Sequence, residues 1–176
     1  MFFKLKLKRA LRTIITLATG VSLTFGSVAA FADDSFSGRL ISRAMDLVGV
    51  KYRFGGTSPT TGLDCSGYVQ YVFQNAVGVT LPRVASAQSH VGERVASQSD
   101  MRPGDLVFFN TRGFAASHVG IYVGNNTFIH SPRSGSSVRF DSMNNSYWSA
   151  RFNGARRVSA SSSRANAFGS NAPLGM

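Results

Sequence analysis

The sequence is poor in cysteine, histidine and acidic side chains. Its 176 residues include one cysteine, three histidines and eight acids, against 19 lysines and arginines. One cysteine excludes an intramolecular disulfide framework and any metal site built on several thiolates. Because 43% of the residues are hydrophobic and only 15% are charged, a disordered chain and a coiled coil are excluded as well. The length suits a single domain.

The shortage of acids gives a formal charge of +11, which would favour a nucleic-acid partner if the charge were spread over a domain. Five of the 19 cations instead crowd the first twelve residues, where there is no acid. An apolar stretch then runs from about Thr13 to Val28 and ends at the small-residue pattern Ala30-Phe31-Ala32. This order is typical of a secretory signal peptide, so we expect cleavage after Ala32. A retained membrane anchor or an amphipathic basic helix is the alternative.

The expected cleavage divides the chain into a signal peptide (1–32), one domain (33–158) and a tail (159–176). The tail is rich in Ser, Ala, Gly and Asn and lacks apolar periodicity, which predicts a flexible segment. We expect no membrane span after cleavage. A moderately basic exported domain suits an anionic polymer of the cell envelope, and nucleic acid is not expected as a partner.

Helical patterns come first in the expected domain and strand patterns follow. Apolar residues recur at helical spacing over 35–48 and again over 65–77, where Asp64 holds the N-cap position. The glycine-rich segment 51–63 predicts a loop, and 81–90 predicts a turn or short helix. Short strand-like runs follow at 94–96, 105–110, 118–123, 127–131, 138–140 and 156–158. This order favours an α+β fold in which N-terminal helices pack on a mostly antiparallel β-sheet.

Cys65 is expected in the first turn of the second helix. Unpaired N–H groups and the helix dipole at that position stabilise a thiolate, which predicts a lowered pKa for the thiol. Gly67, two residues later, lets another chain segment approach closely. An ordinary buried cysteine is the alternative, but a lone thiol in an exported protein favours a nucleophile.

A nucleophilic cysteine needs a base, and His118 and His130 are the candidates. His118 opens a predicted strand and His130 ends the next one, so a hairpin that turns at 124–126 brings the two imidazoles together. One imidazole can then take the thiol proton while the other orients it. Zinc is the competing use of the pair, but the H-x-x-x-H spacing is missing and no acid adjoins either histidine. We expect no metal and no cofactor, and His90 in its polar turn is expected to be solvated.

Tyr52 stands apart from the other aromatic residues because it lies in the glycine-rich loop that leads to Cys65. Its hydroxyl can reach a developing oxyanion or a substrate carbonyl, although a core tyrosine fits the spacing equally well. The strand aromatics are most simply core residues: Phe108, Phe109, Tyr122, Phe128 and Phe140.

Several blocks of sequence follow one another at compatible spacings. They are YRFGG at 52–56, LDCSG at 63–67, LPR at 81–83, RPGDLVFF at 102–109, HVGIYVG at 118–124, FIH at 128–130, YW at 147–148 and GARR at 154–157. Over about residues 39–158 the chain closely resembles the NlpC-type family of papain-like cell-wall peptidases. The resemblance implies a small papain-like fold and the hydrolysis of amide bonds in the stem peptides or cross-links of peptidoglycan. It also implies a bacterial periplasm or cell envelope as the location, and we expect a monomer.

The resemblance also implies roles for single residues. Cys65 resembles the nucleophile of the family, His118 its general base and acid, and His130 the residue that orients the imidazole of His118. Tyr52 resembles an oxyanion or substrate contact.

Asp64 and Ser66 flank the nucleophile as in the family, and the resemblance implies substrate contacts for both. Arg53, Arg83 and Arg133 can meet the carboxylates of stem peptides in a bidentate manner, although each also fits a solvated surface.

Two other functional classes stay open at this point. One is a catalytically silent wall-binding module, in which the cysteine and the histidines do not converge. The other is a papain-like acyl transferase, which forms the same thioester and passes the acyl group to an amine. Within the hydrolase reading, the bond between D-Ala and diaminopimelate and the bond between D-Glu and diaminopimelate both suit the site.

Overall fold

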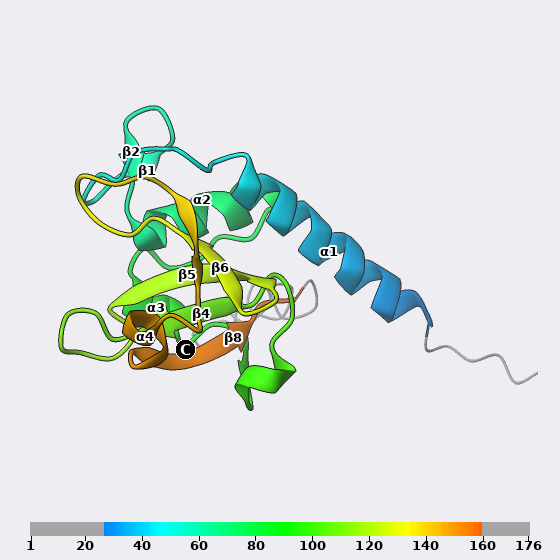
Figure 1. The fold of residues 1–176 in the computed structure, drawn as a ribbon. Coiled ribbons are helices and arrows are strands. Elements are labelled where there is room, and N and C mark those ends of the chain that lie inside the picture. Colours follow the sequence, from blue (N-terminus) through cyan, green and yellow to red (C-terminus); the bar gives the residue numbers. More distant parts are fainter. Residues whose placement is uncertain (1–26, 160–176) are drawn as a thin grey trace, which may run out of the picture.

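An antiparallel sheet carries two long helices and a short one on one face, and another short helix on the other face, in the computed structural model, which describes residues 27–159 (Figure 1). The helices are α1 (Ser27–Met45), α2 (Cys65–Val77), α3 (Ala85–Gln88) and α4 (Ser146–Ser149), with a 3-10 helix at Gln98–Asp100. This arrangement confirms the α+β fold with N-terminal helices on an antiparallel sheet. No helix of the described range has the length and apolar character that crossing a membrane requires.

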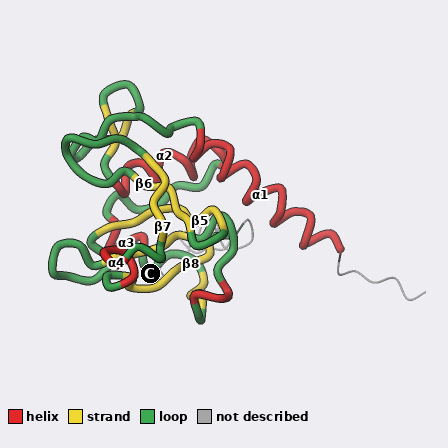
Figure 2. The backbone as a smooth tube through the Cα atoms, viewed as in Figure 1, coloured by secondary structure: helices red, strands yellow, loops and turns green. Residues whose placement is uncertain are grey.

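The main sheet has six strands in the order β3-β8-β4-β5-β6-β7, and every neighbouring pair is antiparallel. The strands are β3 (Glu93–Val95), β4 (Leu106–Phe109), β5 (His118–Gly124), β6 (Thr127–His130), β7 (Arg139–Ser142) and β8 (Phe152–Arg157). A separate two-stranded ribbon, β1 (Thr57–Ser58) and β2 (Gly62–Leu63), lies in the glycine-rich loop before α2. Figure 2 shows how much of the remaining chain is loop.

Both faces of the sheet are covered, and β4 shows this most clearly. Leu106 and Phe108 pack with α1 and α2 in one core, whereas Val107 and Phe109 pack with Trp148 in a second core on the other face. Successive strand side chains point to opposite faces, so a strand between two cores is buried throughout.

An ion pair fastens β8 to the turn before β4. The Arg157 guanidinium donates to both carboxylate oxygens of Asp105, at 2.8 and 2.7 Å, and the Asp105 carboxylate is almost fully buried. Both residues belong to the blocks that carry the family resemblance. Their pairing shows that part of the pattern maintains the fold.

Element boundaries differ from the sequence-based expectation in several places. The helix α1 begins at Ser27, earlier than the predicted 35, and its backbone therefore continues through the expected cleavage point. The rest of the expected signal peptide, and the tail from residue 160, lie outside the described residues. The strand β8 begins at Phe152 rather than at 156, and α4 was not expected from the sequence. The prediction that Phe140 is a core residue is wrong, because Phe140 lies on the edge strand β7 and is 42% exposed.

Candidate active site

Cys65 is the first residue of α2, as predicted, and its side chain meets β5. The backbone N–H groups of Ser66 and Val119 both donate to the Cys65 sulfur. Val119 directly follows His118 at the start of β5. The thiol therefore lies between the beginning of a helix and the strand that carries the first candidate base.

Asp64 caps the helix and ties the neighbouring loops to it. Its carboxylate accepts from the backbone N–H of Gly67 at 2.7 Å and from that of Gly55 at 3.0 Å. Arg83 adds a bidentate pair at 2.6 and 2.9 Å. The predicted N-cap is therefore confirmed, and Arg83 meets a carboxylate of its own chain.

Ser66 belongs to the same network. Its hydroxyl donates to Asp64 at 3.3 Å and accepts from Arg83 at 2.9 Å. Asp64 and Ser66 are 8% and 5% exposed, so most of each side chain is occupied with holding the helix start. We call the side chains of Asp64, Ser66 and Arg83, together with the Gly55 and Gly67 amides, the helix network.

Gly67 brings the helix start against the glycine-rich loop, as expected. A Cβ atom at Gly67 would collide with the backbone carbonyl oxygen of Gly56, and one at Gly56 would collide with the carbonyl oxygen of Gly62. Alanine at Gly67 would therefore push the loop that carries Tyr52 away from the helix, and alanine at Gly56 would distort the loop itself.

The two candidate imidazoles are neighbours, as the hairpin predicted. The strands β5 and β6 pair with Tyr122 opposite Phe128, and the turn between them places Asn125 and Asn126 at positive φ. His118 Nε2 and His130 Nδ1 are 2.7 Å apart. Both side chains are buried, at 4% and 0% exposure.

Asp141 on β7 extends this pair, and sequence reasoning missed it. Its Oδ2 accepts from His130 Nε2 at 2.9 Å and from the indole N–H of Trp148 at 3.1 Å. Arg139 donates to the same oxygen at 3.0 Å. We call His118, His130 and Asp141 the strand relay.

The acceptor at the end of the relay determines which nitrogen atoms carry protons. A carboxylate only accepts, so His130 Nε2–H donates to Asp141 and His130 Nδ1 is left as an acceptor. His118 Nε2–H must then donate to His130 Nδ1. The lone pair of the neutral His118 ring is therefore on Nδ1. The Trp148 indole stacks on the His118 ring, with centroids 5.4 Å apart, and so holds the ring plane.

Burial keeps both partners of the expected reaction uncharged at rest. It lowers the pKa of His118 well below the usual histidine value, with the neighbouring His130 and Arg112 acting in the same direction. Burial and the Asp64 carboxylate raise the pKa of the Cys65 thiol. The prediction of a lowered thiol pKa is therefore wrong, because these effects outweigh the N–H groups and the Arg112 charge that favour the thiolate.

Burial and hydrogen bonds also shift the pKa values of the other two relay groups, His130 and Asp141. Burial lowers the pKa of His130, although the hydrogen bond to Asp141 acts against it. Burial would raise the pKa of the Asp141 carboxyl, but hydrogen bonds from His130 and Arg139 hold it far below its usual value. Asp141 is thus a carboxylate beside a neutral imidazole.

Tyr52 is half-buried beside the thiol, and Arg112 donates a hydrogen bond to its side chain. Burial and the nearby Cys65 raise the pKa of the phenol, so the hydroxyl keeps its proton and can donate. The Arg112 guanidinium also lies over the Phe54 ring, 5.6 Å from its centroid. Sequence reasoning missed Arg112, which lies in a loop without a motif.

Two hollows meet at these groups. One has a volume of about 540 Å³ and is lined by Cys65, Tyr52 and Arg83. The other, of about 570 Å³, is lined by His118 and Arg133. Arg112 lines both hollows. The hollow beside the thiol and the hollow beside the imidazole are therefore neighbours at Arg112.

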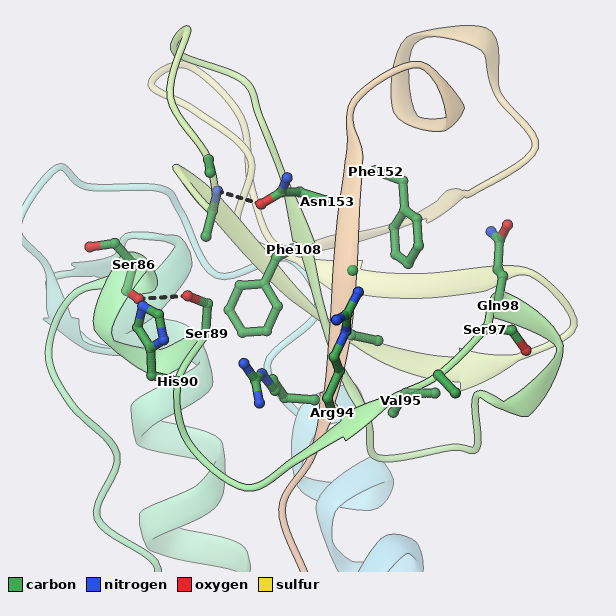
Figure 3. Close-up of a pocket in the computed structure, with 16 residues that line it drawn as sticks. Ser86, Ser89, His90, Arg94, Val95, Ser97, Gln98, Phe108, Phe152 and Asn153 are labelled. Carbon is green, nitrogen blue, oxygen red and sulfur yellow. Dashed lines mark hydrogen bonds between the residues drawn. The ribbon is translucent and has the colours of Figure 1, made fainter.

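Other residues from the sequence analysis lie elsewhere. His90 is exposed, as expected, and lines a neighbouring groove (Figure 3). Arg53 is exposed and lines neither hollow. Between residues 27 and 159, no group of three or more His, Cys, Asp or Glu side chains is arranged to hold a metal ion.

Comparison with known proteins agrees with this geometry. The model of the NlpC/P60 family matches residues 49–157. The chain belongs to the NlpC/P60 family. The resemblance found in the sequence is thereby confirmed, together with the papain-like α+β fold.

Curated relatives of the chain carry names of peptidases and hydrolases. The murein DD-endopeptidase/LD-carboxypeptidase MepS of Escherichia coli K12 is 48% identical over 120 residues, covering 68% of this chain and 62% of the relative. The gamma-DL-glutamyl hydrolase of Bacillus subtilis 168 is 46% identical over 119 residues, covering 67% of this chain and 28% of the relative. The chain thus spans less than two thirds of the length of either relative.

A solved structure shows the same fold. The crystal structure of an NlpC/P60 family protein from Bacillus cereus ATCC 10987 superposes with a TM-score of 0.64 at 33% identity. The match covers 69% of this chain and 39% of that one.

Proposed function

We propose that this chain is an exported cysteine endopeptidase that hydrolyses amide bonds in the stem peptides or cross-links of bacterial peptidoglycan. One observation carries the proposal: the Cys65 sulfur accepts from the N–H of Val119, beside a His118 ring whose Nδ1 lone pair the relay leaves free. The name of the Escherichia coli relative, murein DD-endopeptidase, supports a wall peptide as the substrate, and the name gamma-DL-glutamyl hydrolase of the Bacillus subtilis relative supports a hydrolase.

In the proposed mechanism, Cys65 is the nucleophile and His118 is the general base and acid. His118 Nδ1 takes the thiol proton while the sulfur attacks the peptide carbonyl carbon. Because thiol and imidazole are both uncharged at rest, the thiolate forms during the attack. His118 then gives the proton to the departing amine, which leaves a thioester on Cys65. Water, with His118 again as base, hydrolyses the thioester and restores the thiol.

The oxyanion formed during attack is stabilised by donors at the helix start. The Cys65 backbone N–H and the Tyr52 hydroxyl donate to it, and a single donor of this kind typically contributes about 3 kcal/mol. The bond from Arg112 occupies the oxygen of Tyr52 as an acceptor, so the phenol proton remains available. Asp64 and Ser66 line the hollow beside Cys65, where they hold the helix start and contact substrate at its edge.

His130 and Asp141 act on the reaction through His118. His130 receives the Nε2 proton of His118 in a hydrogen bond and so keeps the reactive lone pair on Nδ1. Asp141 holds His130 in the tautomer that allows this. Both are positioning residues.

The export part of the proposal comes from the sequence. The basic, apolar and small-residue segments of residues 1–32 support a cleaved signal peptide and a periplasmic or envelope location. The remaining domain, residues 33–158, is proposed to be a monomer. Mass spectrometry of the protein recovered from the envelope fraction tests the cleavage after Ala32. Sedimentation of the recovered protein tests the monomer.

The activity is tested by incubating the purified mature protein with peptidoglycan sacculi, beside a Cys65→Ala variant. Mass spectrometry of the released muropeptides identifies the bond that is cut. We expect release by the wild type and a loss of about 10⁴-fold or more in the variant. Equal release by both proteins would remove Cys65 and the hydrolase assignment with it.

Two further experiments distinguish the other two functional classes, an acyl transferase and a silent binding module, from the hydrolase. Repeating the digestion with an added amine reveals an acyl transferase, because new amide products then replace the free carboxylates. A thiol-reactive probe separates a silent binding module, in which Cys65 would be labelled no faster in the wild type than in a His118→Ala variant.

A further inference from the structure

A third groove, of about 720 Å³, continues from the hollow that contains Cys65. The two share Ser86 and Ala116 in their linings, so a chain bound at the thiol can pass directly into the groove. Figure 3 shows Arg94 in the middle of this groove, with His90 on one side and Gln98 on the other. The proposed reaction does not use any of these side chains.

The groove contains two guanidinium groups that form no ion pair with any residue between 27 and 159. Arg94 on β3 and Arg156 on β8 are directly opposite each other in the strand register, and both line the groove. Like charges opposite one another across an antiparallel pair destabilise the sheet. Within residues 27–159 no carboxylate forms an ion pair with either side chain, and none of the described residues that line the groove is acidic.

Arg157, the next residue along β8, is an arginine whose charge stabilises the fold. Arg157 forms a bidentate pair with the buried carboxylate of Asp105. Arg156 belongs to the same four-residue block and is half-buried, yet its charge has no counterpart in the described chain. The cation of Arg156 is therefore left for a ligand from outside.

We propose that Arg94 and Arg156 form a subsite for a carboxylate of the wall peptide, remote from the bond that is cut. The inference rests on the proposed function for the identity of the peptide. Guanidinium groups match carboxylates with paired, charge-assisted hydrogen bonds. Free carboxylates recur along stem peptides. The aromatic rings of Phe108 and Phe152 line the same groove and suit the aliphatic part of such a peptide.

Kinetics of an Arg94→Gln/Arg156→Gln double variant test the subsite. Soluble cross-linked muropeptides serve as one substrate, and the same muropeptides with their carboxylates converted to amides serve as the other. The matched control is Arg39→Gln, which removes a positive charge from α1 outside the groove. A remote contact binds ground state and transition state alike, so it acts on KM and leaves kcat unchanged.

For the natural muropeptides we expect the double variant to raise KM about tenfold, as the loss of one charge-assisted hydrogen-bonded contact does. For the amidated muropeptides we expect the variant and the wild type to have the same KM. Unchanged KM with the natural substrate would overturn the subsite. An equal rise in KM with both substrates would also overturn it, because the arginines would then not be recognising a carboxylate.

A binding measurement separates this inference from the proposed function. In a Cys65→Ala background, calorimetric titration with the same muropeptides gives their Kd with and without the two arginines. A tenfold weaker Kd in the triple variant supports the subsite even if the wild type cuts no wall peptide. Equal Kd values overturn the subsite even if hydrolysis is demonstrated.

Discussion

The thiol and the imidazole of the candidate site are held by two different kinds of network. The helix network gathers Asp64, Ser66 and Arg83 around the start of α2, and its central interaction is an ion pair. The strand relay links side chains on β5, β6 and β7, and it joins two uncharged imidazoles to a single carboxylate. The two meet where the Ser131 hydroxyl, next to His130, donates to the carbonyl of Leu63 at 2.7 Å.

The two networks have different roles: the helix network holds the backbone in place, and the strand relay holds protons on particular ring nitrogens. The Asp64 carboxylate accepts from backbone amides, so the helix network fixes where the chain runs. The relay has ring nitrogens as its links, so it fixes which atom of His118 carries the lone pair. We therefore expect damage to the helix network to appear first in the free energy of unfolding, and damage to the relay to appear first in kcat.

Among changes to the two networks, the largest effect is expected from His130→Ala. The variant removes the acceptor of the His118 Nε2 proton, so the ring can rotate or take the wrong tautomer, and we expect kcat to fall about 10³-fold. His130→Gln is the matched control, because its amide oxygen can still accept that proton, and we expect it to recover part of the loss. Steady-state kinetics with muropeptides and thermal unfolding measure both properties. Unchanged kcat in His130→Ala would show that His118 does not need the relay.

Asp64→Ala tests the other network. The change removes the helix cap and leaves Arg83 without its carboxylate partner, so we expect the free energy of unfolding to fall by about 3 kcal/mol. Asp46→Ala is the control: Asp46 is exposed and makes a 3.5 Å pair with Arg43, so the expected change is below about 0.5 kcal/mol. Chemical denaturation measures both variants. If Asp64→Ala lost activity at unchanged stability, the division between the two networks would be wrong.

The helix network was largely predictable because its parts are close in the sequence. An acid directly before a helical pattern is an N-cap signal, and it positions Cys65 and Gly67 without any knowledge of the tertiary fold. The partnership of Asp64 with Arg83 was not predictable, because it depends on how the chain returns after α2.

Of the relay, only the part joined by the short turn between β5 and β6 was predictable from the sequence. Asn125 and Asn126 join β5 to β6 in a tight hairpin, which fixes the register and hence the meeting of His118 with His130. The connection from β6 to β7 is longer and does not fix a register, so nothing in the sequence paired Asp141 with His130. The one available signal was an acid directly after the strand-like run 138–140, which follows the second histidine.

We expect acid to lower the free energy of unfolding through the two histidines of the strand relay. The pKa values of His118 and His130 are lowered by burial, so below about pH 6.5 the unfolded chain takes up protons that the folded chain does not. The free energy of unfolding then falls by about 1.4 kcal/mol for each histidine with every unit by which the pH is lowered. Denaturation at pH 7.5, 6.5 and 5.5 measures the slope. His90→Gln should keep the slope, since His90 is exposed, whereas His130→Gln should flatten it. A slope that stays the same in His130→Gln would contradict the assignment.

The smallest effect, and the sharpest test of the relay, is the pH profile of Asp141→Asn. The asparagine oxygen still accepts from His130 Nε2, so we expect kcat to fall only about tenfold. The charge of Asp141 raises the pKa of both histidines, and its loss should therefore move the acid limb of kcat/KM to lower pH.

Arg139→Gln is the matched variant for that experiment, with the opposite sign. Arg139 lowers the pKa of His130, so its removal should move the acid limb to higher pH. A role of Asp141 in packing alone would lower activity without moving the limb, and shifts in the same direction for both variants would show that neither charge acts through the relay. Opposite shifts are what a chain of hydrogen bonds from Asp141 to the His118 lone pair requires.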